Sequence, residues 1–248
     1  MTISVRRVLA VVFGVGLAAH LPAQLVEFEL HRLTPSTVRN TSIAVGDIDN
    51  DGDMDLAWVR EDASGRAILI ASNDGQGRFA PSGVPLPIGG LLFYFWFGPL
   101  RLVDLDGDGD LDVLKADEVS ALPFGGTTGY PSVLFRNDGA AGFTDVSSRW
   151  VTTELPRRVV TVDWDGDGAM DIITCNYSTT AGSARSSHIY HQSTNGSFFA
   201  SGWLPPVQRP DLGVAVGDID GDGDPDLVFA VDQLGTAPGS VRGHVQDA

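Results

Sequence analysis

A nine-residue pattern that occurs four times constrains the fold of this 248-residue chain more than any other feature. The copies begin at residues 47, 104, 163 and 218, so successive copies are 57, 59 and 55 residues apart. Each copy has Asp at positions 1, 3, 5 and 9 and Gly at position 6. A spacing this regular is typical of repeat architectures, in which each repeat is one supersecondary unit. The chain is therefore expected to contain four related units.

The chemistry of the nonapeptide predicts a calcium loop. Alternate carboxylates on a tight loop point toward one centre, and their mutual repulsion favours a bound cation. Calcium takes six to eight hard oxygen ligands, and Gly at position 6 permits the positive φ that turns the loop around an ion. The backbone carbonyl at position 7 is a candidate further ligand, because copy three has Ala169 there. About four Ca²⁺ sites are expected, and their predicted residues are Asp47, Asp49, Asp51, Asp53, Asp55, Asp104, Asp106, Asp108, Asp110, Asp112, Asp163, Asp165, Asp167, Ala169, Asp171, Asp218, Asp220, Asp222, Asp224 and Asp226.

Three alternatives to a calcium loop fit the sequence less well. An EF-hand shares the opening of the pattern but needs a bidentate Glu at position 12, and that position is occupied by Trp58, Lys115, Thr174 and Phe229. Solvated Asp/Gly turns would explain one copy more readily than four. Magnesium prefers a few carboxylates plus water to a cage made by the protein alone. Calcium is therefore the favoured ion.

The segments around the loops indicate an all-β fold. Runs such as Ile43–Val45 before copy one and Ile172–Thr174 after copy three are rich in β-branched residues. Later runs in the first two units are separated by Asn-Asp-Gly at 73–75 and 137–139, which is a strong hairpin signal. Each unit should therefore contain four strands, two around the loop and two around the turn.

The loops, together with Asn-Asp-Gly-x-Gly-x-Phe at 73–79, resemble the FG-GAP/VCBS repeat family, which is similar to the N-terminal β-propeller of integrin α-chains. The resemblance covers residues 25–248 and weakens at the third and fourth turns. It implies a β-propeller of four-stranded blades. It also implies that the side chains at positions 1, 3, 5 and 9 are the family's calcium ligands.

The ends of the repeat region suggest how such a propeller would close. The fourth unit has strand signals up to 240–245 and then lacks an outermost strand, whereas the strand predicted at Val26–Leu30 has no unit of its own. Pairing of the two ends would close a four-bladed ring and remove exposed edges. Two alternatives stay open: a fragment or open part of a seven-bladed propeller, and a dimer that completes a larger ring.

Residues 1–23 have the features of a secretory signal peptide. Arg6 and Arg7 precede the apolar stretch Val8–Ala19, whose 12 residues are too few to span a bilayer. The alternative is a hydrophobic N-terminal strand. Cleavage after Ala23 would leave the propeller domain at 24–248, secreted to an extracellular or periplasmic space and without a membrane span.

Charge and composition narrow the possible partners. The four loops contain 5, 5, 4 and 5 acidic residues, together 19 of 32, and four calcium ions would reduce the net charge from −16 to −8. The chain has no basic patch to neutralise phosphates, so no nucleic acid partner is expected. The single cysteine, Cys175, is expected to be a buried strand residue. Leu91–Phe97 is expected to be a central strand or inter-blade core, or else an exposed aromatic patch for a partner.

Two classes of function fit these features. The first is a non-enzymatic adhesion or interaction module for an extracellular protein or glycan, with structural calcium and a monomeric or ring-completing dimeric state. The second is a polysaccharide hydrolase or lyase, or a truncated domain of one. Its only compact candidate cluster is His188, Tyr190 and His191, and strand alternation places His191 on the face opposite the other two. No catalytic residue is therefore predicted.

Overall fold

The structure, a computed structural model, describes residues 7–9, 26–28, 39–63, 65–89, 98–116, 119–122, 126–129, 132–152, 156–176, 187–203, 211–231 and 240–246. The chain divides into two compact units, Met1–Val38 and Arg39–Ala248. Within the described ranges the only helical segments are two short 3₁₀ turns, η1 (Gly139–Ala141) and η2 (Ser147–Arg149). We find no helix in these ranges with the length and apolar character needed to cross a membrane.

In the first unit, β1 (Arg7–Leu9) pairs antiparallel with β2 (Val26–Phe28). β1 lies within the predicted signal peptide, and β2 lies within the strand that was expected to close the ring. The expected pairing of this strand with the fourth unit is therefore not found among the described residues, where β2 pairs with β1 instead. Cleavage after Ala23 would remove β1 and leave β2 without this partner. The remainder of the predicted signal peptide lies outside the described residues.

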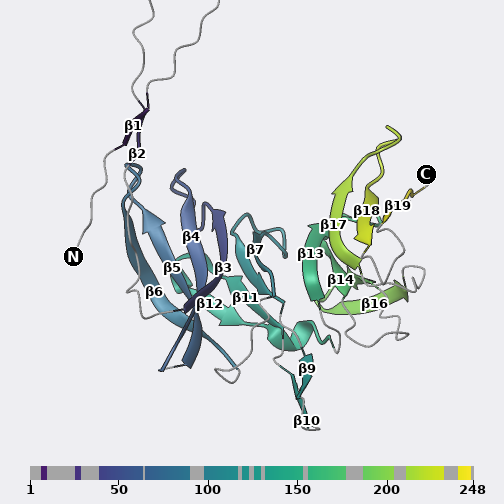
Figure 1. Cartoon of the computed structure of the whole chain (residues 1–248), viewed down its shortest axis with the longest axis horizontal. Helices are drawn as coiled ribbons and strands as arrows, with labels where there is room; N and C mark the ends of the chain where they lie inside the picture. The colour runs from purple at the N-terminus through teal and green to yellow at the C-terminus, as the bar shows by residue number, and fades with distance from the viewer. Residues whose placement is uncertain are drawn as a thin grey trace, which may run out of the picture. The chain divides into compact units, whose positions relative to one another are not determined.

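The second unit consists mainly of four antiparallel sheets that follow one another along the chain, and we call them blades 1 to 4 (Figure 1). Blade 1 has the order β3-β4-β5-β6, so each strand pairs with the next. Its strands are β3 (Arg39–Gly46), β4 (Asp55–Asp62), β5 (Gly65–Asn73) and β6 (Phe79–Ile88).

Blade 2 contains an insertion that the sequence analysis did not predict. The hairpin of β9 (Val119–Leu122) and β10 (Gly126–Gly129) forms a separate two-stranded sheet between its second and third strands. The blade itself has the order β12-β11-β8-β7. Its strands are β7 (Leu100–Val103), β8 (Asp112–Lys115), β11 (Val133–Asn137) and β12 (Phe143–Asp145).

Blades 3 and 4 differ by one strand. Blade 3 has the order β13-β14-β15-β16, and blade 4 has β17-β18-β19. The missing outermost strand of the fourth unit is thus confirmed for the described residues. The strands are β13 (Pro156–Val162), β14 (Asp171–Asn176), β15 (His188–Gln192), β16 (Phe198–Trp203), β17 (Asp211–Gly217), β18 (Asp226–Val231) and β19 (Ser240–His244).

Three apolar cores join consecutive blades. The first lies between blades 1 and 2, the second between blades 2 and 3, and the third between blades 3 and 4. Position 2 of the first three loops contributes to these cores: Ile48, Leu105 and Trp164 are 6%, 7% and 9% exposed. The corresponding Ile219 in loop 4 is 55% exposed. The first three loops are therefore packed into the interface with the next blade, and the fourth is not.

Several smaller predictions have definite outcomes. Cys175 is a fully buried residue of β14, as expected. The position-12 residues Trp58, Lys115, Thr174 and Phe229 are all buried strand residues, which excludes EF-hand loops at these positions. Leu91–Phe97 lies outside the described residues.

Candidate functional site

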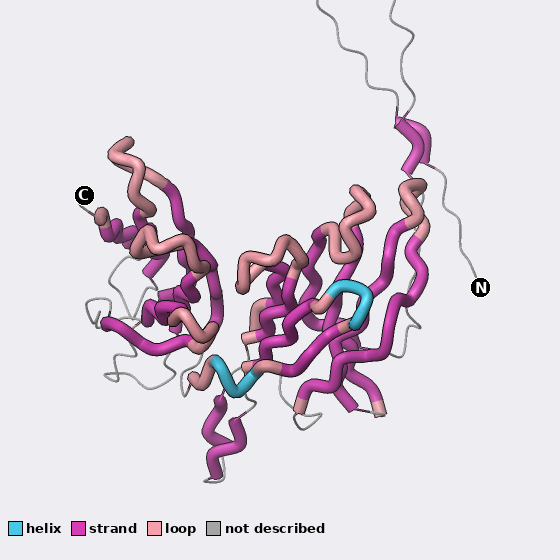
Figure 2. Tube along the Cα trace, turned by 180° about the vertical axis from the view of Figure 1, so that it is seen from behind, coloured by secondary structure: helices cyan, strands magenta, loops and turns pink. Residues whose placement is uncertain are grey.

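Each Asp-rich nonapeptide joins the first and second strands of its blade, as the sequence predicted. We call them loops 1 to 4, at residues 47–55, 104–112, 163–171 and 218–226; they lie among the pink segments of Figure 2. Position 9 is in every case the first residue of the second strand, namely Asp55, Asp112, Asp171 and Asp226. The loops are therefore short connections whose ends are fixed by a sheet.

The backbone turns twice within each loop. Gly at position 6 has φ of 94°, 93°, 91° and 100° in loops 1 to 4, as the pattern predicted. Position 4 also has positive φ, at Asn50 (57°), Gly107 (77°), Gly166 (72°) and Gly221 (83°). The second turn was missed by the sequence analysis, although its signal was present: position 4 is Gly or Asn in every copy, and these residues tolerate the left-handed region.

The carboxylate at position 1 folds the loop around itself. Asp163 accepts hydrogen bonds from the backbone amides of Asp167 (3.0 Å) and Gly168 (2.9 Å). Asp47 accepts from Asp51 (3.1 Å) and Gly52 (3.0 Å) in the same way. The loops therefore have an internal framework of hydrogen bonds that uses some of the predicted ligands.

The carboxylate at position 9 anchors the loop to the sheet. Its exposure is 0%, 2%, 1% and 0% in loops 1 to 4. One oxygen accepts the position-2 amide, at 2.7–3.0 Å across the four loops. The other accepts a backbone amide from the third strand or its end, from Asn73, Asn137, Gln192 and Gln246 at 2.8–2.9 Å. Position 9 thus ties the loop start to the third strand.

The structure brings the predicted ligands together in two combinations. Positions 1, 3 and 9 meet in loops 1 and 4, as Asp47–Asp49–Asp55 and Asp218–Asp220–Asp226. Positions 1, 3 and 5 meet in loops 2 and 3, as Asp104–Asp106–Asp108 and Asp163–Asp165–Asp167. The ligand atoms in each group lie within 4.8 Å of one another. Two carboxylates about 4 Å apart near a surface repel by about 4 kcal/mol, so each group suits a hard cation such as calcium.

The backbone amide of position 7 helps to close each loop. This amide donates to the position-5 carboxylate, at 2.9, 2.9, 2.8 and 3.0 Å in loops 1 to 4. The side chains of Asp53, Asp110 and Asp224 belong to none of the metal groups found among the described residues. The Asp53 carboxylate instead lies against the turn at Gly75, where an added Cβ would be 2.5 Å from it. That the position-7 carbonyl is a ligand stays a prediction.

Burial and hydrogen bonding change the pKa of the anchoring carboxylates. Burial raises the pKa of Asp112 to about 6 and raises that of Asp171 above its ordinary value. The pKa of Asp226 is lowered, chiefly by the amides of Ile219 and Gln246. The pKa shifts are opposite because burial is the largest influence on Asp112 and Asp171, whereas the amide hydrogen bonds are the largest influence on Asp226.

Amide side chains connect the loops of neighbouring blades. Asn137 of blade 2 donates its Nδ2–H to the Ile48 carbonyl of loop 1 (3.0 Å) and to Leu111 of its own loop (3.3 Å). Gln246, after β19, donates its Nε2–H to the Trp164 carbonyl of loop 3 (3.2 Å). Asn50 in loop 1 also donates to Asp110 in loop 2. These links were not predicted from the sequence, because they join residues 60 to 89 positions apart.

A cleft of about 480 Å³ lies between loops 2 and 3. Its walls include Asp104 and Asp106 on one side, Asp167 and Met170 on the other, and the turn at Ser193. The cleft combines carboxylate and hydroxyl groups with apolar surface. It is therefore a candidate binding surface formed by the loops.

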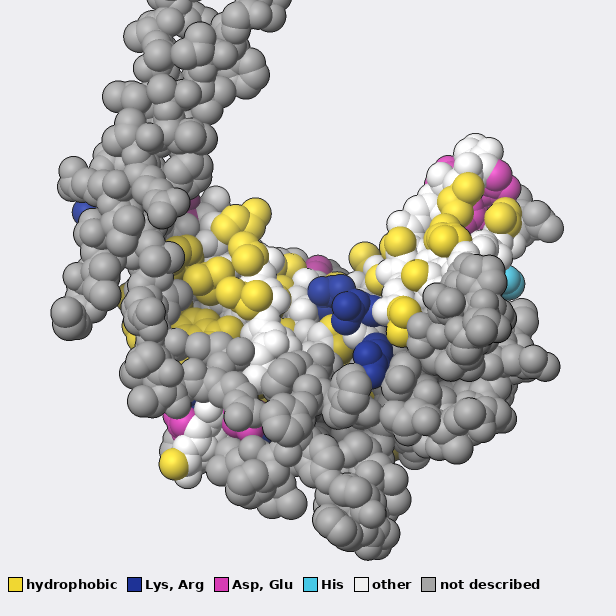
Figure 3. All heavy atoms as spheres, viewed as in Figure 1, with side chains coloured by type: hydrophobic (Ala, Val, Ile, Leu, Met, Phe, Trp, Pro, Cys, Tyr) yellow, Lys and Arg dark blue, Asp and Glu magenta, His cyan; other side chains and the backbone are white. Residues whose placement is uncertain are grey.

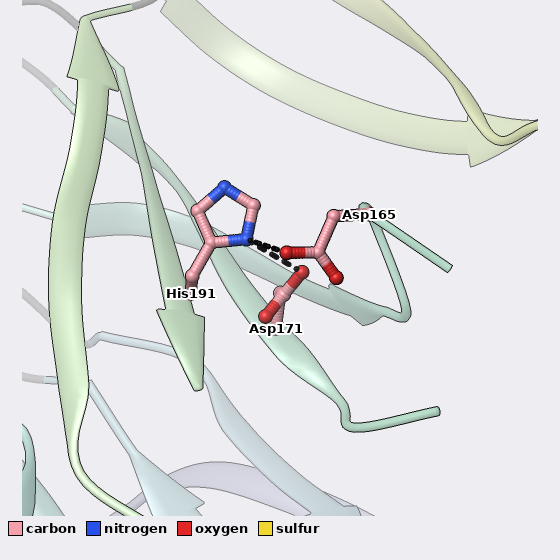
Figure 4. Close-up of side chains that lie close together, drawn as sticks. All are labelled: Asp165, Asp171 and His191. Carbon is pink, nitrogen blue, oxygen red and sulfur yellow. Dashed lines mark ion pairs between the residues drawn. The ribbon is translucent and has the colours of Figure 1, made fainter. Parts of the chain in front are cut away.

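The candidate catalytic cluster is divided as the strand alternation predicted. His188 and Tyr190 are 6% and 5% exposed; His188 Nδ1 lies 3.0 Å from Asn176 Nδ2, and the Tyr190 hydroxyl donates to Thr152 (3.1 Å). His191 points the other way, toward loop 3. Its Nδ1 is 3.0 Å from Asp165 Oδ2 and 3.2 Å from Asp171 Oδ2 (Figure 4).

Comparisons with known proteins agree with the repeat pattern. A family model described as an FG-GAP-like repeat matches residues 47–114 and 177–229. A search of curated proteins returned no significant match. Among solved structures, the chain is similar to a lectin from Agrocybe aegerita described as recognising non-reducing terminal N-acetylglucosamine. That similarity has 16% identity and a TM-score of 0.48, and covers 83% of this chain and 52% of the lectin chain, so this chain spans about half the length of the lectin.

Proposed function

The chain is an FG-GAP-like repeat protein, and on that basis we propose that it is a secreted, calcium-stabilised β-propeller module that binds a protein or glycan without catalysing a reaction. The observation that carries the proposal is the fourfold recurrence of one loop geometry, with three carboxylates converging in every loop. Solvated turns would not need to gather like charges at this cost. Calcium outside the cytoplasm would fill even weak sites of about 10⁻⁴–10⁻³ M.

Substitutions at two aspartates of loop 1 can distinguish calcium binding from the anchoring of the loop. Asp49 is exposed and belongs to the metal group, and it accepts none of the loop's hydrogen bonds among the described residues. Asp55 is fully buried and accepts amides from Ile48 (2.9 Å) and Asn73 (2.8 Å). Asp49→Ala should therefore remove metal binding alone, whereas Asp55→Ala should also remove the anchor.

Calorimetric calcium titration and thermal unfolding of residues 24–248 test this proposal. We expect about four calcium ions per chain and a rise in Tm, since an ion at 100 times its Kd stabilises the fold by about 2.7 kcal/mol. Asp49→Ala should lower the Tm only in calcium, and Asp55→Ala should lower it in both calcium and chelator. A wild-type Tm that does not respond to calcium would refute structural calcium.

The cleft between loops 2 and 3 supports the choice of a binding function. Its mixture of hydroxyls, carboxylates and the apolar Met170 suits a hydroxyl-rich glycan or a polar protein loop. His188 and Tyr190, the residues that the enzymatic alternative would use, are buried instead of facing a cleft. Glycan-array binding that requires calcium would support the module, and release of products from a polysaccharide would support the hydrolase or lyase.

We also propose that the four blades close into a ring after signal-peptide cleavage. Ile43 and Val45 on β3 are 62% and 58% exposed, and Ile219 in loop 4 is 55% exposed. These side chains belong to the first and last blades, and apolar side chains are prominent on the surface shown in Figure 3. Packing blade 4 against blade 1 would bury them as the other interfaces bury Ile48. A second copy of the chain is the alternative partner for these surfaces.

A further inference from the structure

Loop 3 differs from the other loops because a histidine nitrogen points into its carboxylate group. His191 belongs to β15 and is the residue before Gln192, whose amide bonds Asp171. The equivalent residues before the corresponding amide donors are Ser72, Arg136 and Val245 in blades 1, 2 and 4. Blade 3 is therefore the only blade with an imidazole at this position among the four.

The His191 side chain is held in a geometry suited to a ligand. Its Nδ1 lies 3.0 Å from an oxygen of Asp165 at position 3 and 3.2 Å from an oxygen of Asp171 at position 9 (Figure 4). This nitrogen is buried and forms no hydrogen bond of acceptable geometry with any described residue. The ring packs against Phe199 of β16, with 6.0 Å between ring centroids. A fixed nitrogen beside two carboxylate oxygens is an arrangement that one shared cation would satisfy.

We propose that Asp165, Asp171 and His191 form a mixed nitrogen–oxygen site for a divalent transition ion of the zinc class. Neutral imidazole is a good ligand for such ions, and zinc bonds of about 2.0–2.2 Å to nitrogen and oxygen put neighbouring ligand atoms in the separation range seen here. Calcium takes oxygen ligands, so the nitrogen donor favours a different ion at loop 3. The inference refines the proposed calcium function for one loop, and it is tested separately from that function.

The residues at the His191 position in the other three blades explain why loops 1, 2 and 4 should bind calcium and not zinc. Ser72 and Val245 offer no nitrogen donor to the groups of loops 1 and 4. Arg136 cannot ligate a cation; its Nε lies 2.7 Å from Asp138 and 3.9 Å from Asp106 of loop 2. A transition ion should therefore bind once per chain, at loop 3.

Zinc titration of the mature chain in saturating calcium tests the proposal. Calorimetry should show one zinc ion per chain, and ¹⁵N-histidine NMR should show one perturbed ring whose signal is absent in His191→Ser. The zinc affinity of this variant should be about 100-fold lower than that of the wild type. Loss of a residue that only supports a metal ligand already lowers metal affinity by about 10- to 100-fold, and His191 is proposed to be a ligand itself. His244→Gln, a histidine that stacks on Trp164 and belongs to no metal group described here, should bind zinc as the wild type does.

Ser72→His is a matched gain-of-site variant, because it places an imidazole at the equivalent position of loop 1. A second zinc ion per chain is expected for it. Equal zinc affinity in wild type and His191→Ser, or no zinc-dependent shift of any histidine ring in calcium, would overturn the proposal. Four calcium ions without zinc binding would refute only this inference, and one zinc ion without calcium binding would refute only the calcium function.

Discussion

At the scale of single residues, identical aspartates in each loop have different roles. Positions 1 and 9 accept backbone amides and hold the loop in shape, whereas position 3 contributes a carboxylate to the metal group of every loop. The buried position 9 takes part in both functions, since its oxygens accept amides and also join the groups in loops 1 and 4. Loop stability and metal affinity are therefore coupled mainly through this residue.

Asp112 should make the calcium-free protein less stable as the pH rises. Burial raises its pKa from 3.8 to about 6, so between these pH values the folded state binds a proton that the unfolded state has released. The free energy of unfolding should thus fall across this window, by about 3 kcal/mol in total. Chemical denaturation in calcium-free buffer at pH 4 to 7 measures the loss.

Asp112→Asn is the matched variant, because its side chain stays neutral at every pH. It should lack this component of the pH dependence, although it also loses an acceptor for the Leu105 or Asn137 amide. The informative quantity is the difference in slope between the two proteins, since every other carboxyl group is common to both. Parallel pH profiles would contradict the raised pKa.

The loops could be predicted because the Asp/Gly pattern that forms each of them lies within nine consecutive residues. Asp and Gly at fixed positions restrict a nine-residue backbone directly, and even the missed turn at position 4 had a local signal in Asn50 and three glycines. The approach of His191 to loop 3 could not be predicted in this way. It depends on the register of β14 and β15, in which Ile172 pairs with Tyr190.

At the scale of elements, amide side chains connect one blade to the loop of the preceding blade. We expect Asn137→Ala to cost about 1–3 kcal/mol of unfolding free energy, because it leaves the carbonyls of Ile48 and Leu111 without their donor in a buried position. The hydrogen bond from the backbone amide of residue 137 to Asp112 would remain in this variant. Urea unfolding in calcium measures the cost.

Asn73→Ala is the control for Asn137→Ala. Asn73 occupies the equivalent position in blade 1, but its Nδ2 donates to Met54 of its own loop in an exposed setting (3.1 Å). Its replacement should cost less than that of Asn137. Hydrogen exchange should also rise in loop 1 of the Asn137 variant. Equal costs for both variants would argue against a link between blades 1 and 2.

Strand positions were predicted well where alternation and turns agree, as in β5, β11 and β15. The β9–β10 hairpin was missed because the segment 119–129 has little hydrophobic alternation, and its three glycines and two threonines resemble a loop. Pairing between distant segments was the least predictable feature. Local propensity does not determine which of two short apolar strands, β1 or a strand of blade 4, will pair with β2.

At the scale of the whole molecule, the exposure of position 2 provides a test of ring closure. Ile48 is 6% exposed in the core between blades 1 and 2, whereas Ile219 is 55% exposed. If the mature chain closes its ring, Ile219 should be buried against blade 1 in the same way. Ile48→Ala and Ile219→Ala in residues 24–248 should then each cost about 2–5 kcal/mol.

Denaturation of both variants at two protein concentrations, together with the molar mass from light scattering, separates the possible assemblies. A cost at Ile219 that does not change with concentration, in a monomer, would support closure within one chain. A cost that appears only at high concentration, in a dimer, would show that a second copy covers blade 4. A neutral Ile219→Ala beside a costly Ile48→Ala would refute closure, because an exposed isoleucine loses little when it is shortened.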